Sequence, residues 1–223
     1  MKAMILAAGR GERLRPLTDQ TPKPLLKAGG KALIVHLIER LVSAGFDDIV
    51  INYAHLGEQF PATLGDGSRW GAKISYSPEL SGGLETAGGI IHALPLLGDQ
   101  PFLVVNGDIW TDMDFADFRH VLTDDNLCHL LLVPNPPQHP AGDFYLDDHN
   151  KLHAEGPEKY TFSGIAVYRP ELFAGLDDRK RPLKPLLLRA MQQHQASGTL
   201  YQGQWSDIGT AERLDMLDHQ LQR

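Results

Sequence analysis

Short apolar runs alternate with longer amphipathic stretches along the first half of the chain. Apolar runs of this length, bounded by polar or turn-forming residues, are typical of buried strands. The runs that predict strands are Met4–Ala7, Asp48–Asn52, Lys73–Tyr76, Phe102–Val105 and His129–Val133. Because helical stretches separate them, the pattern predicts an α/β fold with a mostly parallel sheet flanked by helices.

The clearest helical stretch is Ala32–Ser43. Its apolar residues Leu33, Leu37 and Leu41 share one helical face, and Gly45 follows, where a helix commonly ends. The other crossovers are predicted as helices over Leu56–Leu64, Thr86–Leu97 and Phe115–Leu122.

After Val133 the elements become shorter and are separated by turns. Residues 134–142 are rich in proline and predict a linker. Phe144–Leu146 and Leu152–Ala154 flank polar turn residues, which predicts an antiparallel hairpin. Further elements are expected as a strand over Thr161–Tyr168 and helices over Leu183–Gln195 and Thr210–Gln222.

The composition is that of an ordinary globular chain, with 223 residues, 42% of them hydrophobic and 22% charged. The single cysteine, Cys128, excludes an internal disulfide and predicts a reducing compartment. The N-terminal apolar stretch is short for a signal peptide, and no run approaches the roughly 20 apolar residues of a membrane span. We therefore expect one domain in the cytoplasm, with no membrane partner.

The net charge of −7 is distributed unevenly. Residues 1–31 carry a balance of +5, so the remainder carries −12. Most of such a surface repels DNA and RNA, whereas a small basic region suits a compact polyphosphate. We expect a small phosphorylated ligand and no nucleic-acid partner.

The most informative segment follows the first predicted strand and runs from Leu6 to Lys23, with the sequence Ala-Ala-Gly-Arg-Gly-Glu-Arg-Leu-Arg-Pro-Leu at its start and Thr-Pro-Lys at its end. Gly9 and Gly11 allow the backbone to approach a ligand and to turn its N–H groups inward. Positive charge that can clamp phosphates comes from Arg10, Arg13, Arg15 and Lys23. The segment is not a Walker A loop, which needs Gly-Lys-Ser or Gly-Lys-Thr after four spacer residues. It is not a dinucleotide fingerprint either, because Leu14 stands where the third glycine should be. A plain surface turn is the alternative.

Two carboxylates lie in positions that suit a metal. Asp108 follows a predicted strand, and Asp207 precedes the last predicted helix. Asp108 follows the apolar run that begins at Phe102, after Asn106 and Gly107. Ligands of open α/β sheets lie beyond the carboxyl ends of strands, so Asp108 is expected to project into the site. Asp207 precedes Thr210, which is the better cap for the last helix and so leaves Asp207 free. Magnesium prefers one or two carboxylates together with substrate phosphates. The alternative for Asp108 is a turn cap, and Asp112 and Asp114 are nearby substitutes.

Four glycines surround the start of the helix predicted at Thr86, within the segment Ser81-Gly-Gly-Leu-Glu-Thr-Ala-Gly-Gly-Ile. They allow backbone groups to contact the edge of a planar base and the helix to pack closely on the sheet. A glycine-rich turn without a ligand is the alternative.

Taken together, these stretches resemble the sugar-phosphate nucleotidyltransferases over nearly the whole chain. The signature loop matches from Leu6 to Lys23, and Asn-Gly-Asp at 106–108 and Trp-x-Asp-Ile-Gly-Thr at 205–210 follow in the family's order. The resemblance implies a Rossmann-like nucleotidyltransferase fold in a single domain, 1–223, without a β-helix extension. Residues 1–133 would bind the nucleotide, and residues 134–223 would form a small antiparallel part that binds the sugar.

The resemblance also implies roles for individual residues. Lys23 and Arg13 would be catalytic, with Lys23 on the α-phosphate and the sugar phosphate and Arg13 on the nucleotide phosphates. The other nucleotide-binding positions would be Ala8, Gly9, Gly11, Glu12, Gly83 and Gly107. The sugar phosphate would contact Asn106, Gly142, Asp143, Glu155 and Gly164. Asp108 and Asp207 would share one Mg²⁺.

Segments 82–89 and 159–165 resemble those of family members that use UTP and N-acetylmuramate α-1-phosphate, so the resemblance implies UTP as donor and this sugar phosphate as acceptor. The lactyl carboxylate of that sugar calls for a cation, with Lys159, Lys184 and Arg189 as candidates. Many relatives carry glutamine in the base-reading segment, where this chain has residues 76–81, so the base remains open. The alternatives are a mannose-1-phosphate guanylyltransferase, a cytidylyltransferase, and a regulatory subunit that binds a nucleotide sugar without turnover. The oligomeric state, monomer or dimer, also remains open.

Overall fold

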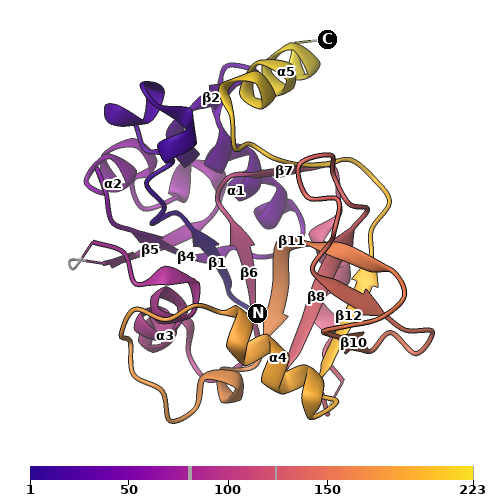
Figure 1. Cartoon of the computed structure of the whole chain (residues 1–223). Coiled ribbons are helices and arrows are strands. Elements are labelled where there is room, and N and C mark those ends of the chain that lie inside the picture. Colours follow the sequence, from indigo (N-terminus) through magenta and orange to yellow (C-terminus); the bar gives the residue numbers. More distant parts are fainter. Residues whose placement is uncertain (80–81, 124, 223) are drawn as a thin grey trace.

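The computed structural model describes residues 1–79, 82–123 and 125–222, and one mixed sheet runs through this part of the chain (Figure 1). Its strands follow the order β10-β9-β11-β6-β1-β4-β5, and β8 pairs with both β11 and β12. The strands are β1 (Ala3–Leu6), β4 (Asp48–Tyr53), β5 (Lys73–Pro78), β6 (Phe102–Asn106), β8 (Cys128–Val133), β9 (Phe144–Leu146), β10 (Leu152–His153), β11 (Lys159–Tyr168) and β12 (Ala196–Leu200).

The centre of the sheet is parallel and one side of it is antiparallel. Strands β6, β1, β4 and β5 all run in one direction. Strand β11 runs against β6 and against β8, whereas β12 is parallel to β8. The carboxyl ends of β1, β4, β5 and β6 therefore meet at one edge, which is where an open α/β sheet binds its ligands.

Helices cover both faces because successive side chains of a strand point to opposite sides. On β1, Ile5 joins the apolar cluster that includes α1 (Leu33–Ser43) and α2 (Gln59–Leu64). Met4 joins the cluster on the other face, which includes α3 (Glu85–Leu97) and α4 (Lys184–Gln192). The sheet is thus the middle of three layers, with a core on each side (Figure 1).

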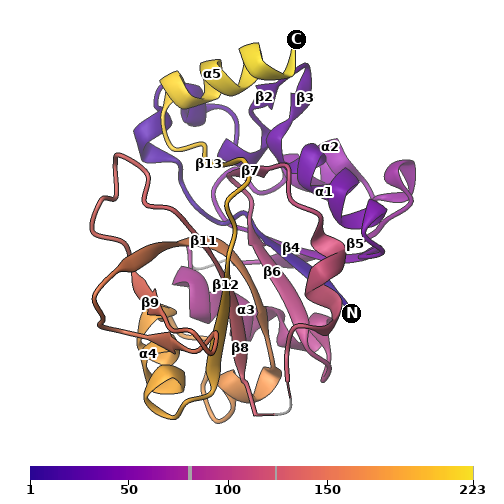
Figure 2. The same ribbon diagram turned by 90° about the vertical axis from the view of Figure 1, so that its right-hand side faces the viewer.

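The end of the chain returns to its beginning. Strand β13 (Trp205–Asp207) pairs with β7 (Ile109–Thr111), directly after β6. Helix α5 (Ala211–Leu221) then packs beside the ribbon of β2 (Lys27–Ala28) and β3 (Lys31–Ala32), as Figure 2 shows. Leu214 and Leu217 of α5 are buried with Leu33 and Trp110. Thr210 caps α5, because its hydroxyl accepts the backbone N–H of Arg213, as the sequence predicts.

The five strands predicted for the first half are confirmed within one or two residues, as are the helices expected over Ala32–Ser43 and Thr86–Leu97. The hairpin of β9 and β10 and the strand expected over Thr161–Tyr168 are confirmed as well. Among the described residues, no helix has the length and apolar character needed to cross a membrane.

Three predicted helices need correction. The stretch Leu56–Leu64 becomes helical only at Gln59, since Leu56 has a φ of 54°, outside the helical region. Phe115–Leu122 forms a 3₁₀ helix, Phe115–His120, instead of an α-helix. Leu183–Gln195 ends at Gln192, because His194 has a φ of 57° and strand β12 begins at Ala196. Strands β2, β3, β7, β12 and β13 were not predicted.

Candidate functional site

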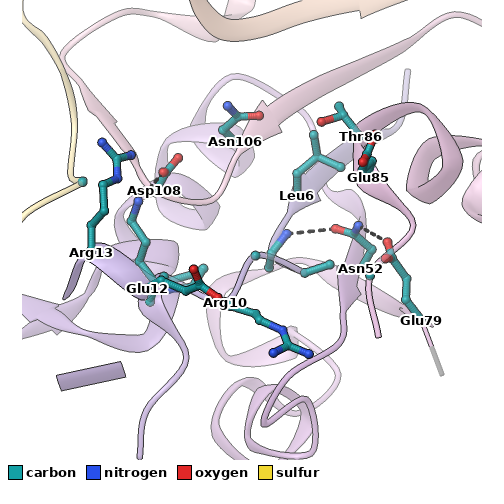
Figure 3. A pocket seen from close by; sticks show the side chains of 18 residues that line it. Leu6, Arg10, Glu12, Arg13, Asn52, Glu79, Glu85, Thr86, Asn106 and Asp108 are labelled. Atoms are coloured by element: carbon teal, nitrogen blue, oxygen red, sulfur yellow. Dashed lines mark hydrogen bonds and ion pairs between the residues drawn. The ribbon is translucent and has the colours of Figure 1, made fainter. Parts of the chain in front are cut away.

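A cavity of about 530 Å³ lies at the carboxyl ends of the parallel strands (Figure 3). The glycine-rich loop after β1 forms one wall, and the start of α3 forms another. The predicted site residues that line the cavity are Ala8, Gly9, Gly11, Glu12, Arg13, Lys23, Gly83, Asn106 and Asp108. Residues from distant parts of the sequence therefore converge on one space.

The loop holds its shape through Gly11 and Leu14. Gly11 has a φ of 64°, which favours glycine, and its carbonyl accepts the N–H of Leu14 at 2.8 Å. A Cβ at Gly11 would lie 2.9 Å from Cγ2 of Thr18, so no larger residue fits. The side chain of Leu14 is buried and anchors the loop to the core.

Lys23 and Asp108 form an ion pair beside this loop. Lys23 follows Pro22 and is the first residue of a short 3₁₀ helix, Lys23–Leu25. Lys23 is only 9% exposed. Its Nζ lies 2.5 Å from Oδ2 of Asp108, which follows β6 after one glycine, Gly107. Gly107 lies outside the cavity lining and donates its N–H to the carbonyl of Leu6 at 2.8 Å. It therefore supports the turn that carries Asp108.

Asp207 comes close to this pair through the β7–β13 ribbon. It lies opposite Ile109 in the register, and the N–H of Ile208 donates to the carbonyl of Asp108 at 2.8 Å. The side chain of Asp207 pairs with Arg213 and also accepts from Gln138 at 2.9 Å. It is not among the lining residues of the cavity. One carboxylate in the turn before β7 and one on β13 are oxygen donors of the kind and number that Mg²⁺ takes from proteins.

The loop arginines differ in position. A Cβ at Gly209, which lines the cavity, would lie 3.1 Å from Nη2 of Arg13 and 3.2 Å from Oδ2 of Asp207, so Arg13 reaches toward the metal candidates. Arg10 also lines the cavity. Arg15 instead forms a surface ion pair with Asp19 at 3.3 Å.

The alternative carboxylates Asp112 and Asp114 have local structural partners. Asp112 accepts hydrogen bonds from the hydroxyl of Tyr201 and from the N–H of Gln204. Asp114 accepts from the N–H of Ala116 at 2.9 Å and caps the 3₁₀ helix that follows. Neither Asp112 nor Asp114 lines the cavity, whereas Asp108 does, so Asp108 is better placed to hold a metal there.

The predicted sugar residues form two groups. Gly164 lies against Asn106, since a Cβ there would be 2.4 Å from Nδ2 of Asn106. The register of β11 shifts between Phe162 and Ala166, so Gly164 stands in a bulge, a feature common beside active sites. The second group, at the start of β11, is Gly142, Asp143 and Glu155, none of which lines the cavity.

Contacts within this second group are local. Asp143 accepts the N–H of Phe162 at 2.9 Å. Glu155 is 86% exposed in its side chain and pairs with Lys159 at 3.0 Å. A Cβ at Gly142 would lie 2.7 Å from the carbonyl oxygen of Lys159. Of the three cations considered for a lactyl carboxylate, Lys159 thus lies among the predicted sugar residues, whereas Lys184 and Arg189 belong to α4.

Sequence reasoning missed several cavity residues, namely Asn52, Glu79, Glu85 and Thr86. Asn52 is near the end of β4 and Glu79 follows β5, so polar residues at the ends of predicted parallel strands were the available signal. Glu85 has a φ of 59°, an uncommon conformation for a residue other than glycine. Leu80 and Ser81, part of the segments predicted to contact the base, lie outside the described residues.

Comparisons with known proteins agree with this geometry. The model of the nucleotidyl transferase family matches residues 2–222. The chain is 55% identical to an N-acetylmuramate α-1-phosphate uridylyltransferase of Neisseria meningitidis serogroup B, over 96% of this chain and 95% of the relative. It is 32% identical to a protein of the same description from Caulobacter vibrioides, over 93% and 91%.

Among solved structures, a protein from Bacillus anthracis described as a putative glucose-1-phosphate thymidylyltransferase, in complex with a sucrose, has the same fold. The TM-score is 0.87 at 22% identity, and the match covers 100% of this chain and 95% of that protein. The predicted fold class is therefore confirmed.

Proposed function

Because the chain belongs to the nucleotidyl transferase family, we propose that it transfers UMP from UTP to N-acetylmuramic acid α-1-phosphate, which yields UDP-N-acetylmuramic acid and pyrophosphate. Such a reaction serves the recycling of cell-wall peptidoglycan. The observation that carries the proposal is the Lys23–Asp108 pair beside a glycine-rich loop, in a cavity bordered by Asn106.

The chemistry is an in-line displacement at phosphorus. An oxygen of the sugar phosphate forms a bond to the α-phosphorus of UTP, and the bond from that phosphorus to the bridging oxygen breaks, so pyrophosphate leaves with the electron pair. A phosphate monoester has a second pKa of about 6 and is mostly dianionic at neutral pH. The attacking oxygen therefore carries no proton that a general base must remove.

Two anions have to meet, so the protein's task is electrostatic. Lys23 is placed to exchange Asp108 for the phosphate oxygens of the substrates, and Arg13 to bind the nucleotide phosphates. Asp108 and Asp207 would hold Mg²⁺, which when bound neutralises phosphate charge. Positioned cations lower the barrier because they match charge that develops in the transition state.

Sugar recognition is assigned to Asn106 and Gly164 at the cavity and to Gly142 and Asp143 beside it. Glu155, which is 86% exposed in its side chain, would join them only if its segment closes over the substrate. Lys159 is the candidate for the lactyl carboxylate, because it lies in this group. The cytoplasm stays a prediction, supported by the buried, unpaired thiol of Cys128.

The test is pyrophosphate release by the purified protein with Mg²⁺. UTP, GTP, CTP and dTTP are each paired with N-acetylmuramate α-1-phosphate, glucose 1-phosphate and mannose 1-phosphate. We expect the highest kcat/KM for UTP with the muramate. A higher kcat/KM for GTP with mannose 1-phosphate would show that the protein transfers GMP instead of UMP. If none of the substrate pairs released pyrophosphate, the proposed function would be wrong.

The metal assignment has its own test. Asp108→Asn and Asp207→Asn should each raise the Mg²⁺ concentration needed for half-maximal rate by about tenfold or more, the loss expected when ligands of a metal are weakened. Asp112→Asn is the matched control, because Asp112 is held by Tyr201 and Gln204. Unchanged magnesium titrations in both site variants would contradict the shared ion.

A further inference from the structure

A buried side-chain bridge joins the two segments that flank the nucleotide cavity. The N–H of Ala7 donates to Oδ1 of Asn52 at 2.9 Å, and Nδ2 of Asn52 donates to Oε1 of Glu79 at 2.6 Å (Figure 3). The other carboxylate oxygen of Glu79 accepts the N–H of Leu84 at 2.6 Å. Asn52 is 2% exposed and Glu79 is 4% exposed, so these bonds are largely shielded from water.

The bridge has ends of fixed polarity. Both terminal groups, the N–H of Ala7 and the N–H of Leu84, are backbone donors. Among amides and ionised carboxylates, two side chains link two donors without a mismatch when one is an amide and the other is a carboxylate. Two amides would place one donor against another, and two carboxylates would place unprotonated oxygens together. The pairing of Asn52 with Glu79 meets this requirement.

The two ends of the bridge bear on different parts of a nucleotide. Ala7 directly precedes Ala8 and the glycine-rich loop, where the phosphates are expected, and Leu84 directly follows Gly83, where the base is expected. Resting on the function proposed above, we propose that Asn52 and Glu79 are positioning residues that set the spacing between the phosphate loop and the base segment. They would act on UTP affinity through these two backbone segments.

Helix α3 packs directly against the bridge at Gly89. A Cβ at this position would lie 2.5 Å from Oε1 of Glu79 and 2.9 Å from Nδ2 of Asn52. Glycine inside a helix is less favourable than alanine, so its presence here is explained by the close approach of the bridge. Gly89→Ala is therefore a second way to disturb the bridge without changing either of its side chains.

The test exploits the polarity rule. Glu79→Gln and Asn52→Asp each leave one mismatched contact, whereas Asn52→Asp combined with Glu79→Gln restores every hydrogen bond with amide and carboxylate exchanged. Binding of UTP with Mg²⁺ is measured by titration calorimetry without the sugar phosphate. We expect Kd to rise about tenfold or more in each single variant, as for a buried polar group left unpaired, and to return to within about threefold of the wild type in the double variant.

Steady-state kinetics supplies the readout that a merely structural role would not move. KM for UTP should rise in the single variants and in Gly89→Ala, while KM for the sugar phosphate stays unchanged. Ser197→Ala is the matched control, because it removes a buried hydrogen bond to His129 on β8, outside the cavity lining. If Asn52→Asp does not fold, Glu79→Gln and Gly89→Ala decide the question.

The possible outcomes separate the two proposals. Wild-type UTP affinity in Glu79→Gln and Gly89→Ala would overturn the positioning role and leave the proposed transfer intact. A double variant no better than the singles would also overturn it. Wild-type protein that binds no UTP would instead refute the proposed function.

Discussion

The two halves of the chain contribute to the cavity unequally. Among the described residues, every lining residue comes from residues 1–133 except Gly209. The second half, residues 134–223, places Gly164 against Asn106, and it gathers Gly142, Asp143 and Glu155 around the start of β11. The predicted nucleotide-binding residues therefore mostly line one cavity, whereas the predicted sugar residues other than Asn106 lie outside its lining.

Strand direction explains the difference. Parallel strands end at the same edge of a sheet. Polar residues that follow them therefore lie close together, whatever path the connecting helices take. In the antiparallel part the strand ends fall on both edges, and the place of a residue depends on turns and on the bulge at Gly164. The predictions below test whether the two halves differ in function as they differ in geometry.

The largest effect is expected in the first half. Lys23→Ala should lower kcat about 10²–10³-fold, the scale of losing one key electrostatic contact to the transition state. The fold should persist, because the Asp108 side chain is 28% exposed and can be solvated once its partner is removed. Pyrophosphate release gives kcat, and circular dichroism reports the fold.

Lys31→Ala is the control for this variant. Lys31 pairs with Glu39 at 2.7 Å on the surface, and neither residue lines the cavity. Its kcat should equal that of the wild type. A folded Lys23→Ala protein with normal turnover would remove Lys23 from the mechanism.

The second effect concerns the contact between the halves. His129 on β8 hydrogen-bonds Ser197 and Thr199 on β12, and burial lowers its pKa to about 4. As the pH falls, His129 takes up a proton in the unfolded chain at a higher pH than in the folded protein. Its contribution to the free energy of unfolding is therefore fully present above about pH 6.5 and is lost as the pH drops toward 4. Between pH 7 and pH 5 we expect a loss of about 2 kcal/mol from this group.

Urea unfolding at the two pH values measures the loss. His129→Gln cannot take up the proton, so its free energy of unfolding should change less over the same interval. Equal pH dependence in both proteins would show that β8 and β12 are not held together by a neutral histidine.

The difference between the two halves also explains how much of the molecule could be predicted from sequence. The loop from Leu6 to Lys23 and the Asp108 turn carry their own local signals, and residues of both line the cavity. Strand β13, which carries Asp207, has no such signal, because its pairing with β7 is decided by the return of the chain across the sheet. The Asn52–Glu79 bridge was missed because single polar residues at strand ends gain meaning only from their partners.

A smaller effect is expected from Asp143 in the second half. Asp143→Ala removes the acceptor for the N–H of Phe162, just before the bulge at Gly164. KM for the sugar phosphate should rise about tenfold, the loss of roughly one charged hydrogen bond, while KM for UTP stays within about twofold. Asp147→Ala, in the β9–β10 turn, is the control and should change neither value. A rise in KM for UTP would assign Asp143 to the nucleotide instead.

The smallest effect is expected at Glu155, and it tests whether the sugar part of the second half is complete as it stands or closes over the substrate. Glu155 is 86% exposed and its pair with Lys159 is a surface ion pair, which contributes little to stability. If the sugar binds to the site as it stands, Glu155→Gln should change KM for the sugar phosphate less than about twofold, measured at saturating UTP. Lys159→Met should raise the same KM more, because it removes the candidate partner of the lactyl carboxylate. A larger effect at Glu155 would mean that this segment closes over the substrate, so that the second half completes the cavity only in the complex.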